Sequence, residues 1–260
     1  MTKTANMLSV ESSQERYAEE RRQGEKLLAG GCADVAWGWS GPAGAIRAER
    51  RAEFLIQQAG LKPGVTCLEL GCGTGEFTTR LLRSGCALSA VELSEATAAV
   101  CRQRVAGKAE IIVGNIETGE GLQGRTFAAI VGISVLHHVN MELCLKHTLT
   151  LLKPGGRFAF SEPNMSNPQV WLERHVGFLR RWRHATLHET AFRACALRRL
   201  FESAGLEVSV CEPFDFLHPS TPRWCIGAVK LLERMLEATP LRVLAGSVRI
   251  AGGRATMNAE

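Results

Sequence analysis

The sequence predicts a doubly wound α/β domain with a mostly parallel sheet of seven strands. From residue 65 onward, short and nearly continuous apolar segments alternate with longer segments whose apolar residues recur at helical spacing. Strands with an uninterrupted apolar pattern are typical of a parallel sheet that helices cover on both faces. The predicted strands are 65–70, 87–93, 109–115, 126–134, 156–163, 207–214 and 246–252.

The predicted helices between these strands have recognisable boundaries. The helix predicted over 94–105 opens with Ser94 as its N-cap, and Pro154 with two glycines ends the helix over 141–153. A further helix is predicted at about 189–204. Because crossovers between parallel strands are right-handed, the loops at the carboxyl ends of the strands should meet along one edge, where a ligand would bind.

The chain divides into three regions that we expect to belong to one domain. Residues 1–60 are charged and helix-prone and predict an N-terminal helical cap, and residues 61–163 hold the alternating core that should bind a cofactor. Residues 164–260 supply two irregular insertions, expected to act as lids, and the last two strands. A chain of 260 residues is long enough for one large core.

Composition and charge exclude several classes of protein. The apolar share of 45% and the charged share of 22% are ordinary for a globular protein. The net charge is +5, but the basic residues are scattered, so nucleic acid is not the expected partner. No stretch approaches the ~20 apolar residues that span a bilayer, and the first twenty residues hold no apolar core of a signal peptide. A cytoplasmic location is therefore expected.

The cysteines and histidines predict no metal centre. Nine cysteines are spread from Cys32 to Cys225 without a C-x-x-C pair, and we expect them to be reduced thiols. His184 and His188 have the spacing of a helical metal-binding pair, but no third ligand lies near them in the sequence.

A glycine-rich loop, CLELGCGTGEF, follows the first predicted strand. Its three alternating glycines are Gly71, Gly73 and Gly75. Glu76 stands where the dinucleotide fingerprint has its last glycine, and Glu69 is expected to face the same pocket; both carboxylates disfavour a pyrophosphate. Glu92, at the end of the second strand, can accept hydrogen bonds from ribose hydroxyls. The loop therefore predicts a nucleoside with a positively charged neighbour and no phosphate.

Five motifs in order then resemble those of the class I S-adenosylmethionine-dependent methyltransferases, whose fold is Rossmann-like. The resemblance is close over about residues 60–163 and holds only in outline elsewhere. The motifs are LELGCGTG (68–75), VELS (91–94), GNIE (114–117), GISVLHHV (132–139) and LLKPGGRFAFSEPN (151–164).

The resemblance implies which residues would bind S-adenosylmethionine. The loop under the methionine part of the cofactor maps onto Glu69, Gly71, Cys72, Gly73 and Gly75. Glu92 would hold the ribose, with Leu93 beside the adenine. Asn115, followed by Ile116, stands where the family usually has aspartate, and its amide oxygen can still accept from the adenine amino group; an ordinary turn residue is the alternative. Gly132, at the start of the fourth motif, completes the predicted cofactor site.

Two residues are candidates for catalysis. Methyl transfer needs an aligned acceptor and, for a hydroxyl or ammonium acceptor, removal of a proton. His137 and His138 follow the fourth strand, and because neighbouring residues point in different directions, at most one should face the acceptor. His137 is the candidate base, and packing or contact with the edge of the cofactor is the alternative. Glu162, at the end of the fifth strand, is the second candidate, or else it braces the loop at Pro163.

The insertions should select the acceptor. Residues 171–185 combine an apolar helical face with four arginines, which predicts a lid helix and leaves open attraction of an anionic substrate or contact with an anionic membrane surface. Six aromatic and histidine side chains could line an aromatic pocket or pack as lid core: Trp37, Trp39, Phe214, Phe216, His218 and Trp224.

The sequence thus predicts an S-adenosylmethionine-dependent methyltransferase that acts on an oxygen or nitrogen of a small molecule. One alternative is an NAD-dependent oxidoreductase on a related fold, and the other is a non-catalytic module that binds S-adenosylmethionine. The sequence specifies neither the acceptor nor the oligomeric state.

Overall fold

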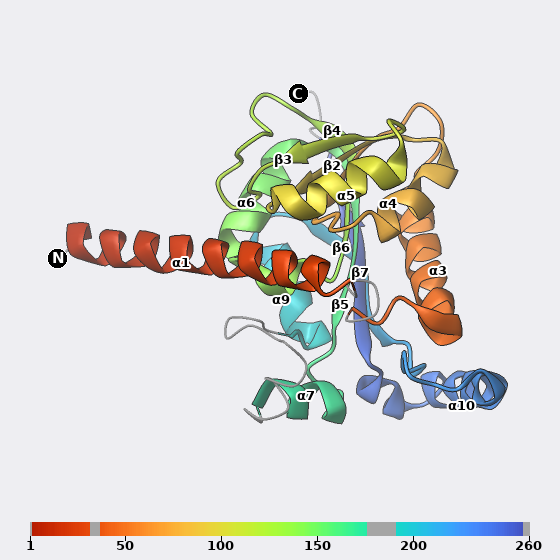
Figure 1. Cartoon of the computed structure of the whole chain (residues 1–260). Helices are drawn as coiled ribbons and strands as arrows, with labels where there is room; N and C mark the ends of the chain where they lie inside the picture. The colour runs from red at the N-terminus through yellow and green to blue at the C-terminus, as the bar shows by residue number, and fades with distance from the viewer. Residues whose placement is uncertain (1, 32–36, 176–190, 257–260) are drawn as a thin grey trace.

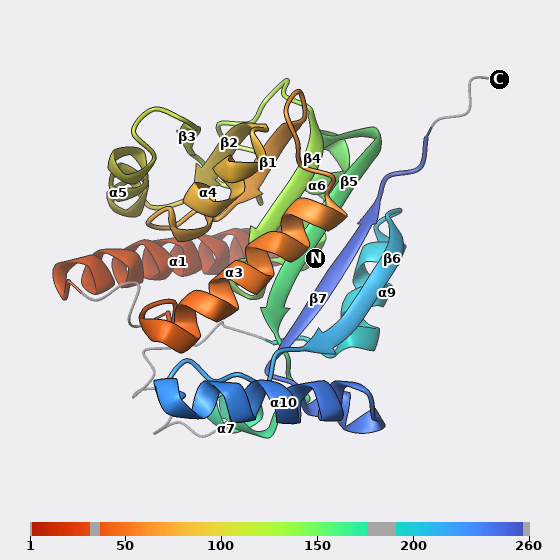
Figure 2. The same cartoon turned by 90° about the vertical axis from the view of Figure 1, so that its right-hand side faces the viewer.

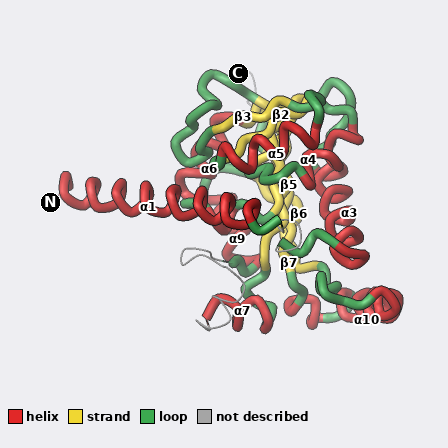
Figure 3. Tube along the Cα trace, viewed as in Figure 1, coloured by secondary structure: helices red, strands yellow, loops and turns green. Residues whose placement is uncertain are grey.

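The computed structural model describes residues 2–31, 37–175 and 191–256, which form one seven-stranded sheet between two layers of helices (Figures 1 and 3). The strand order is β3-β2-β1-β4-β5-β7-β6. Strand β7 runs antiparallel to both neighbours, whereas the other pairs are parallel, so the predicted sheet is confirmed. The strands are β1 (Thr66–Leu70), β2 (Ala87–Glu92), β3 (Glu110–Val113), β4 (Phe127–Ile133), β5 (Leu152–Pro163), β6 (Glu207–Phe214) and β7 (Ser247–Gly253).

Helices α3, α4 and α5 cover one face of the sheet, and α6 and α9 cover the other (Figure 2). Short 3₁₀ turns connect the elements: η1 (Leu82–Ser84), η2 (Leu136–His138), η3 (Arg223–Cys225) and η4 (Pro240–Leu244). The helices are α1 (Thr2–Ala29), α3 (Gly41–Gln58), α4 (Glu76–Leu81), α5 (Glu95–Val105), α6 (Met141–Leu151), α7 (Pro168–His175), α9 (Ala194–Ser203) and α10 (Ile226–Glu237).

The alternation of side chains along the strands explains why both faces need cover. In β1, Leu68 packs into the core beneath α6 and α9, whereas Cys67 packs into the core beneath α3 and α4. In β5, Phe158 and Phe160 meet Phe201 of α9 with ring centroids 4.8 and 5.7 Å apart. Both faces of the central strands are therefore apolar, as the sequence pattern indicates.

Most predicted boundaries hold, and two differ. Ser94 caps α5 by accepting from the Thr97 amide at 3.4 Å. Helix α6 ends at Leu151 because Leu152 already pairs with Phe127 of β4, so β5 begins earlier than predicted. The stretch 215–242, predicted to be irregular, contains helix α10. Of the predicted lid segment, residues 176–185 lie outside the described residues.

Helix α1 crosses the edge of the sheet where the parallel strands end, and its first half projects away from the rest of the molecule (Figure 1). Helix α7 and helix α10 lie together at one end of the molecule in both views (Figures 1 and 2). Across the described ranges, every helix is too short or too polar to cross a membrane.

Candidate active site

A cavity of about 490 Å³ opens at the edge of the sheet where the parallel strands end, the edge at which the sequence predicts ligand binding. The loops that follow β1, β2, β3 and β4 line its floor. Residues of α1, α3, α7 and the 215–219 segment form its sides. Its volume is in the range that holds small organic ligands.

The glycine loop depends on left-handed backbone that other residues rarely adopt. Gly71 and Gly75 have φ angles of 67° and 87°. A Cβ atom on Gly71 would lie 2.6 Å from Val135, and one on Gly75 would lie 2.9 Å from the Cys101 sulfur. Cys72, between them, lines the cavity and is buried. Side chains at these glycines are excluded, and the loop backbone forms part of the cavity floor.

Glu92, at the end of β2, ties the glycine loop to the start of α5. Its two carboxylate oxygens accept from the Gly73 amide at 2.9 Å and the Ser94 amide at 3.0 Å. Glu92 and Leu93 both line the cavity, and Trp37 lies over Gly73. A carboxylate oxygen accepts more than one hydrogen bond, so Glu92 retains capacity for a ligand hydroxyl.

Three predicted cofactor residues are absent from the cavity lining: Glu69, Gly75 and Gly132. Glu69 is 3% exposed and is not among the lining residues, so the expectation that it faces the pocket is wrong. Burial raises the pKa of Glu69 to about 8, and across the described residues its Oε2 has no hydrogen-bond partner. Gly132 is also absent from the lining; a Cβ there would clash with Val135 and Phe160, which explains the glycine by packing.

The loop after β3 joins the cavity to helix α1. Asn115 and Ile116 both line the cavity, and Asn115 Oδ1 accepts from the Glu117 amide at 2.9 Å. Glu117 is buried and accepts from both terminal nitrogens of Arg16 at 2.6 Å and from the Tyr17 hydroxyl at 2.9 Å. These contacts fix the second half of α1 over this side of the cavity.

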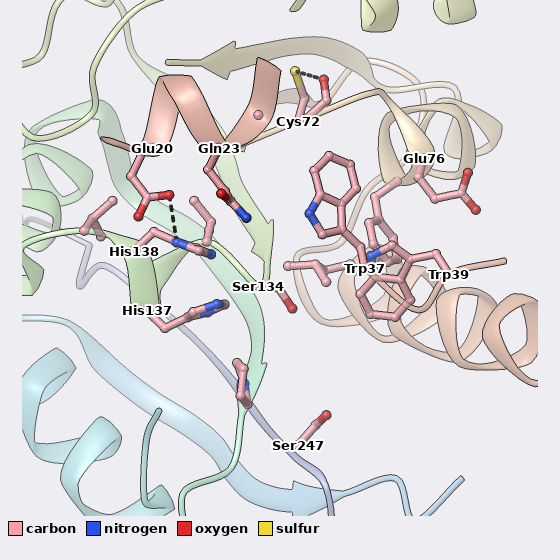
Figure 4. A pocket seen from close by; sticks show the side chains of 18 of the residues that line it. Glu20, Gln23, Trp37, Trp39, Cys72, Glu76, Ser134, His137, His138 and Ser247 are labelled. Carbon is pink, nitrogen blue, oxygen red and sulfur yellow. Dashed lines mark hydrogen bonds and ion pairs between the residues drawn. The ribbon is translucent and has the colours of Figure 1, made fainter. Parts of the chain in front are cut away.

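Helix α1 supplies lining residues that the sequence analysis missed. Arg16, Tyr17 and Glu20 all line the cavity, and Glu20 lies 3.0 Å from Nδ1 of His138 (Figure 4). The helix is polar on all sides, so periodicity gives no sign of the face that packs. A buried ion pair between residues about a hundred positions apart has no local signal.

His137 and Glu162 form a hydrogen-bonded pair. His137 lines the cavity and is 5% exposed, and its Nδ1 lies 2.7 Å from Glu162 Oε2. Glu162 Oε1 accepts from the Val135 and Leu136 amides at 3.0 and 2.9 Å. Burial raises the pKa of Glu162 to about 7 despite these hydrogen bonds. Glu162 thus lies behind His137 and engages its Nδ1.

His137 and His138 both line the cavity, and the expectation that at most one of them faces the acceptor stays a prediction. They lie in the tight turn η2, and their ring centroids are 4.1 Å apart (Figure 4). A 3₁₀ turn does not alternate its side chains as a strand does, so neighbouring residues can share one side.

The side of the cavity opposite the glycine loop is formed by a buried ion cluster. It consists of Arg47, Arg51 and Asp215, and we call it the arginine cluster. Asp215 Oδ2 lies 2.6 Å from Arg51 Nη2 and accepts from Arg47 Nε at 2.9 Å. Arg51 also donates to Ser247 Oγ at 2.6 Å, and both guanidinium groups lie 5.3 Å from the Trp39 ring centre. Burial lowers the pKa of Arg51 to about 10. Burial alone would raise the pKa of Asp215, but the two arginines outweigh it and the pKa is lowered.

The structure divides the predicted aromatic residues into two groups. Phe214 is buried beneath Arg51, and Trp224 is 85% exposed on the outer surface. The other four line the cavity: Trp37, Trp39, Phe216 and His218. The residues described contain no cluster of three or more His, Cys, Asp or Glu that could hold a metal ion. His184 and His188 lie outside those residues.

Comparison with known sequences gives one family. The sequence model of a family described as a methyltransferase domain matches residues 45–209. The ubiquinone biosynthesis O-methyltransferase of Coxiella burnetii is 29% identical over 152 residues, which cover 55% of this chain and 64% of that protein. The protein of the same name from Azotobacter vinelandii is 30% identical over 118 residues, 44% of this chain and 50% of that protein. The chain therefore spans less than two thirds of the length of these relatives.

Solved structures share the fold. The magnesium protoporphyrin IX methyltransferase of Synechocystis PCC 6803, with bound S-adenosyl-homocysteine (SAH), matches with a TM-score of 0.59 at 12% identity, over 92% of this chain and 100% of that one. The N-methyltransferase NodS of Bradyrhizobium japonicum WM9, in complex with S-adenosyl-L-homocysteine, matches with a TM-score of 0.55 at 14% identity, over 83% and 89% of the two chains. At these identities the likeness concerns the fold.

Proposed function

The chain belongs to the methyltransferase domain family, and from that premise we propose that it moves a methyl group from S-adenosylmethionine to an oxygen or nitrogen of a small-molecule acceptor. The observation that carries the proposal is the position of His137, which is held by Glu162 and lines the same cavity as Glu92 and the glycine loop. A nucleoside site and a proton acceptor thus share one space.

The residues along β1, β2 and β3 fit the cofactor. The glycine loop offers backbone at close range because Gly71 and Gly73 line the cavity without side chains. Glu92 would accept from the ribose hydroxyls, and Asn115 and Ile116 would lie along the adenine. When bound, the cofactor supplies a methyl group activated on a sulfonium. Glu69 and Gly132 would act from behind the wall, by supporting the loop and by close packing.

His137 would remove the proton from the acceptor. With Nδ1 donating to Glu162, the ring accepts a proton at Nε2, and the Glu162 carboxylate stabilises the imidazolium that forms. A hydroxyl acceptor needs such a base more than a neutral amine does. The curated relatives also carry the name O-methyltransferase, so we favour oxygen as the acceptor atom.

The arginine cluster and its aromatic neighbours would select the acceptor. Trp39 presents a flat ring, and the cluster and Ser247 add polar atoms at the same side of the cavity. These features suit a planar molecule with polar substituents. In this proposal residues 61–163 bind the cofactor, and residues 1–60 and 164–260 cover it and bind the acceptor. A cytoplasmic location remains a prediction.

Thermal unfolding with added ligands, followed by a turnover assay, tests the function. We expect S-adenosylmethionine and its demethylated product to raise the melting temperature, and NAD(H) to leave it unchanged. Labelled methyl should then appear on members of a panel of phenols and amines. Stabilisation by NAD(H) alone would favour the oxidoreductase. Binding of S-adenosylmethionine without turnover of any panel member would favour a non-catalytic module.

A further inference from the structure

Helix α10 directs three large apolar side chains outward and one carboxylate inward. Leu231, Leu232 and Met235 are 62%, 53% and 63% exposed, whereas Glu233 of the same helix is 3% exposed. In most helices at a protein surface the charged face meets water and the apolar face meets the core. In α10, by contrast, three large apolar side chains meet water and a carboxylate meets the protein.

The inward acids fix the orientation of α10 on the body of the protein. Both oxygens of Glu233 accept from Arg50 Nη1, at 2.9 and 2.8 Å, and Oε1 also accepts from the Phe216 amide at 2.9 Å. Glu237 accepts from the Asp215 amide at 3.3 Å. Rotating the helix to bury its leucines would break these contacts and leave Arg50 only its longer contact with Asp215 Oδ1, at 3.6 Å. The outward position of the leucines is therefore built in.

The exposed apolar side chains continue beyond α10 into the turns on either side of it. Trp224 of η3 is 85% exposed, and Leu241 and Val243 of η4 are 51% and 46% exposed. The α10 apolar surface, as we name it, consists of Trp224, Leu231, Leu232, Met235, Leu241 and Val243. Several exposed apolar side chains on consecutive elements mark an interaction site more often than single exposed leucines do.

The charges that border the α10 apolar surface are positive. Arg223 and Arg234 are exposed, and Lys230 is half-exposed. The two acids between residues 223 and 244 are Glu233 and Glu237, whose side chains turn inward to Arg50 and the 215–216 backbone. An apolar face with a basic border and an exposed tryptophan has the character of a helix that lies in a membrane interface.

We propose that the α10 apolar surface binds an anionic lipid bilayer, with α10 lying in the plane of the interface. The apolar side chains would enter the boundary between head groups and acyl chains, and the three basic side chains would meet anionic head groups. A second copy of this chain fits less well, because it would bring the same basic border against its own like charges.

The surface lies close to the acceptor side of the cavity. Ile226 and Val229, on the inner face of α10, pack with Leu217, and Leu217 lines the cavity. Through the 215–217 segment, α10 also contacts the arginine cluster. A bilayer on this surface would therefore lie near the side at which the acceptor is proposed to bind. Membrane binding itself needs neither cofactor nor activity, so it is tested apart from the proposed function.

Vesicle co-sedimentation of the full chain tests the proposal. We compare vesicles of phosphatidylcholine alone with vesicles that also contain phosphatidylglycerol. The expected result is binding to the anionic vesicles that weakens as salt is added. The double variant Leu231→Glu/Met235→Glu should bind at least about tenfold more weakly, because it places two charges in the apolar contact. Arg223→Glu/Arg234→Glu should lose the preference for phosphatidylglycerol.

Two controls keep the test decisive. Leu143→Glu changes a leucine of α6 that is 37% exposed and should leave vesicle binding intact. Quenching by brominated lipids should affect the tryptophan emission of the original chain and much less that of Trp224→Phe. The proposal is overturned if the chain stays in the supernatant with both kinds of vesicle, or if the double variant binds as well as the original chain. A dimer in light scattering that the double variant abolishes would assign the surface to a second copy instead.

Discussion

The glycine loop after β1 and the arginine cluster line two sides of one cavity, but they are held in different ways. In Figure 4, Cys72 of the loop and Ser247 beside the cluster lie at opposite ends of the labelled residues, with His137 and Ser134 between them. The loop is fixed by its own glycines and by Glu92, nineteen positions from Gly73. The cluster joins Arg47 to Asp215, 168 positions away, and Arg51 to Ser247, 196 positions away.

This difference separates two kinds of information. The cofactor side uses backbone groups and left-handed glycines, which a short stretch of sequence encodes. The acceptor side uses buried charges from distant elements, which exist only once the chain has folded. Substitutions on the two sides should therefore fail in different ways: at the loop by weaker cofactor binding, and at the cluster by loss of stability.

The largest expected effect is at the boundary between the two sides. His137→Ala should lower the turnover rate by ~10²–10⁴-fold if His137 is the base, because general base catalysis contributes about that much. Steady-state kinetics with an accepted substrate measures this. His147→Ala, on α6 and absent from the cavity lining, is the matched control and should keep its rate. A loss below tenfold in His137→Ala would make His137 a packing residue.

The second prediction concerns the arginine cluster. Asp215→Asn should destabilise the fold by about 3–5 kcal/mol, because it leaves Arg51 and Arg47 without their buried counter-ion. Asparagine tolerates the positive φ of 73° at this position, so the change tests charge rather than backbone strain. Urea unfolding gives the difference. Glu110→Ala, which breaks an exposed pair with Arg125, should cost at most about 1 kcal/mol. An equal loss of unfolding free energy in Asp215→Asn and Glu110→Ala would contradict the claim that buried charges hold the acceptor side together.

The third prediction concerns the cofactor side. Glu92→Ala should weaken binding of S-adenosylmethionine by ~1–3 kcal/mol, through lost hydrogen bonds to the ligand and a looser loop at Gly73. Glu92→Gln keeps one acceptor oxygen and should therefore weaken S-adenosylmethionine binding less than Glu92→Ala does. Glu95→Ala, which changes the exposed first residue of α5, should bind S-adenosylmethionine as the original chain does. Calorimetric titration compares the three, and unchanged affinity in Glu92→Ala would remove Glu92 from the ribose site.

The fourth prediction is a pH dependence of stability. Burial raises the pKa of Glu69 from 4.5 to about 8, so folding favours its protonated form. Stability from this group is complete below pH 4.5 and is lost as the pH rises to about 8. Glu69→Gln removes this loss, so its free energy of unfolding relative to that of the original chain should increase as the pH rises between these limits. If the difference in unfolding free energy between Glu69→Gln and the original chain is the same at both pH values, Glu69 does not titrate between them.

Much of the fold follows from the sequence for a physical reason. Buried parallel strands must be apolar, and their turns need specific residues, so both features are visible locally in segments such as 65–75. The same holds for Glu92 and His137, which stand at strand ends that the topology brings to one edge. Whether these residues perform the predicted roles is decided by the measurements above.

Other features could not be predicted from the sequence because they depend on contacts between residues far apart in the chain. Glu69 alternates with Leu68 and Leu70 in β1, but nothing local says that it points behind the wall rather than into the cavity. The face of α1 that packs is set by a buried Glu117 far along the chain. Helix α10 was not predicted because Glu233 faces the protein while Leu231 and Leu232 face outward, the opposite of the usual amphipathic pattern.

The central claim is that one side of the cavity holds the cofactor and that His137 serves the acceptor. Calorimetric titration of S-adenosylhomocysteine into His137→Ala tests it most directly. The account predicts an affinity equal to that of the original chain in a variant whose turnover has collapsed. A loss of affinity as large as that of Glu92→Ala would contradict it, because His137 would then belong to the cofactor site.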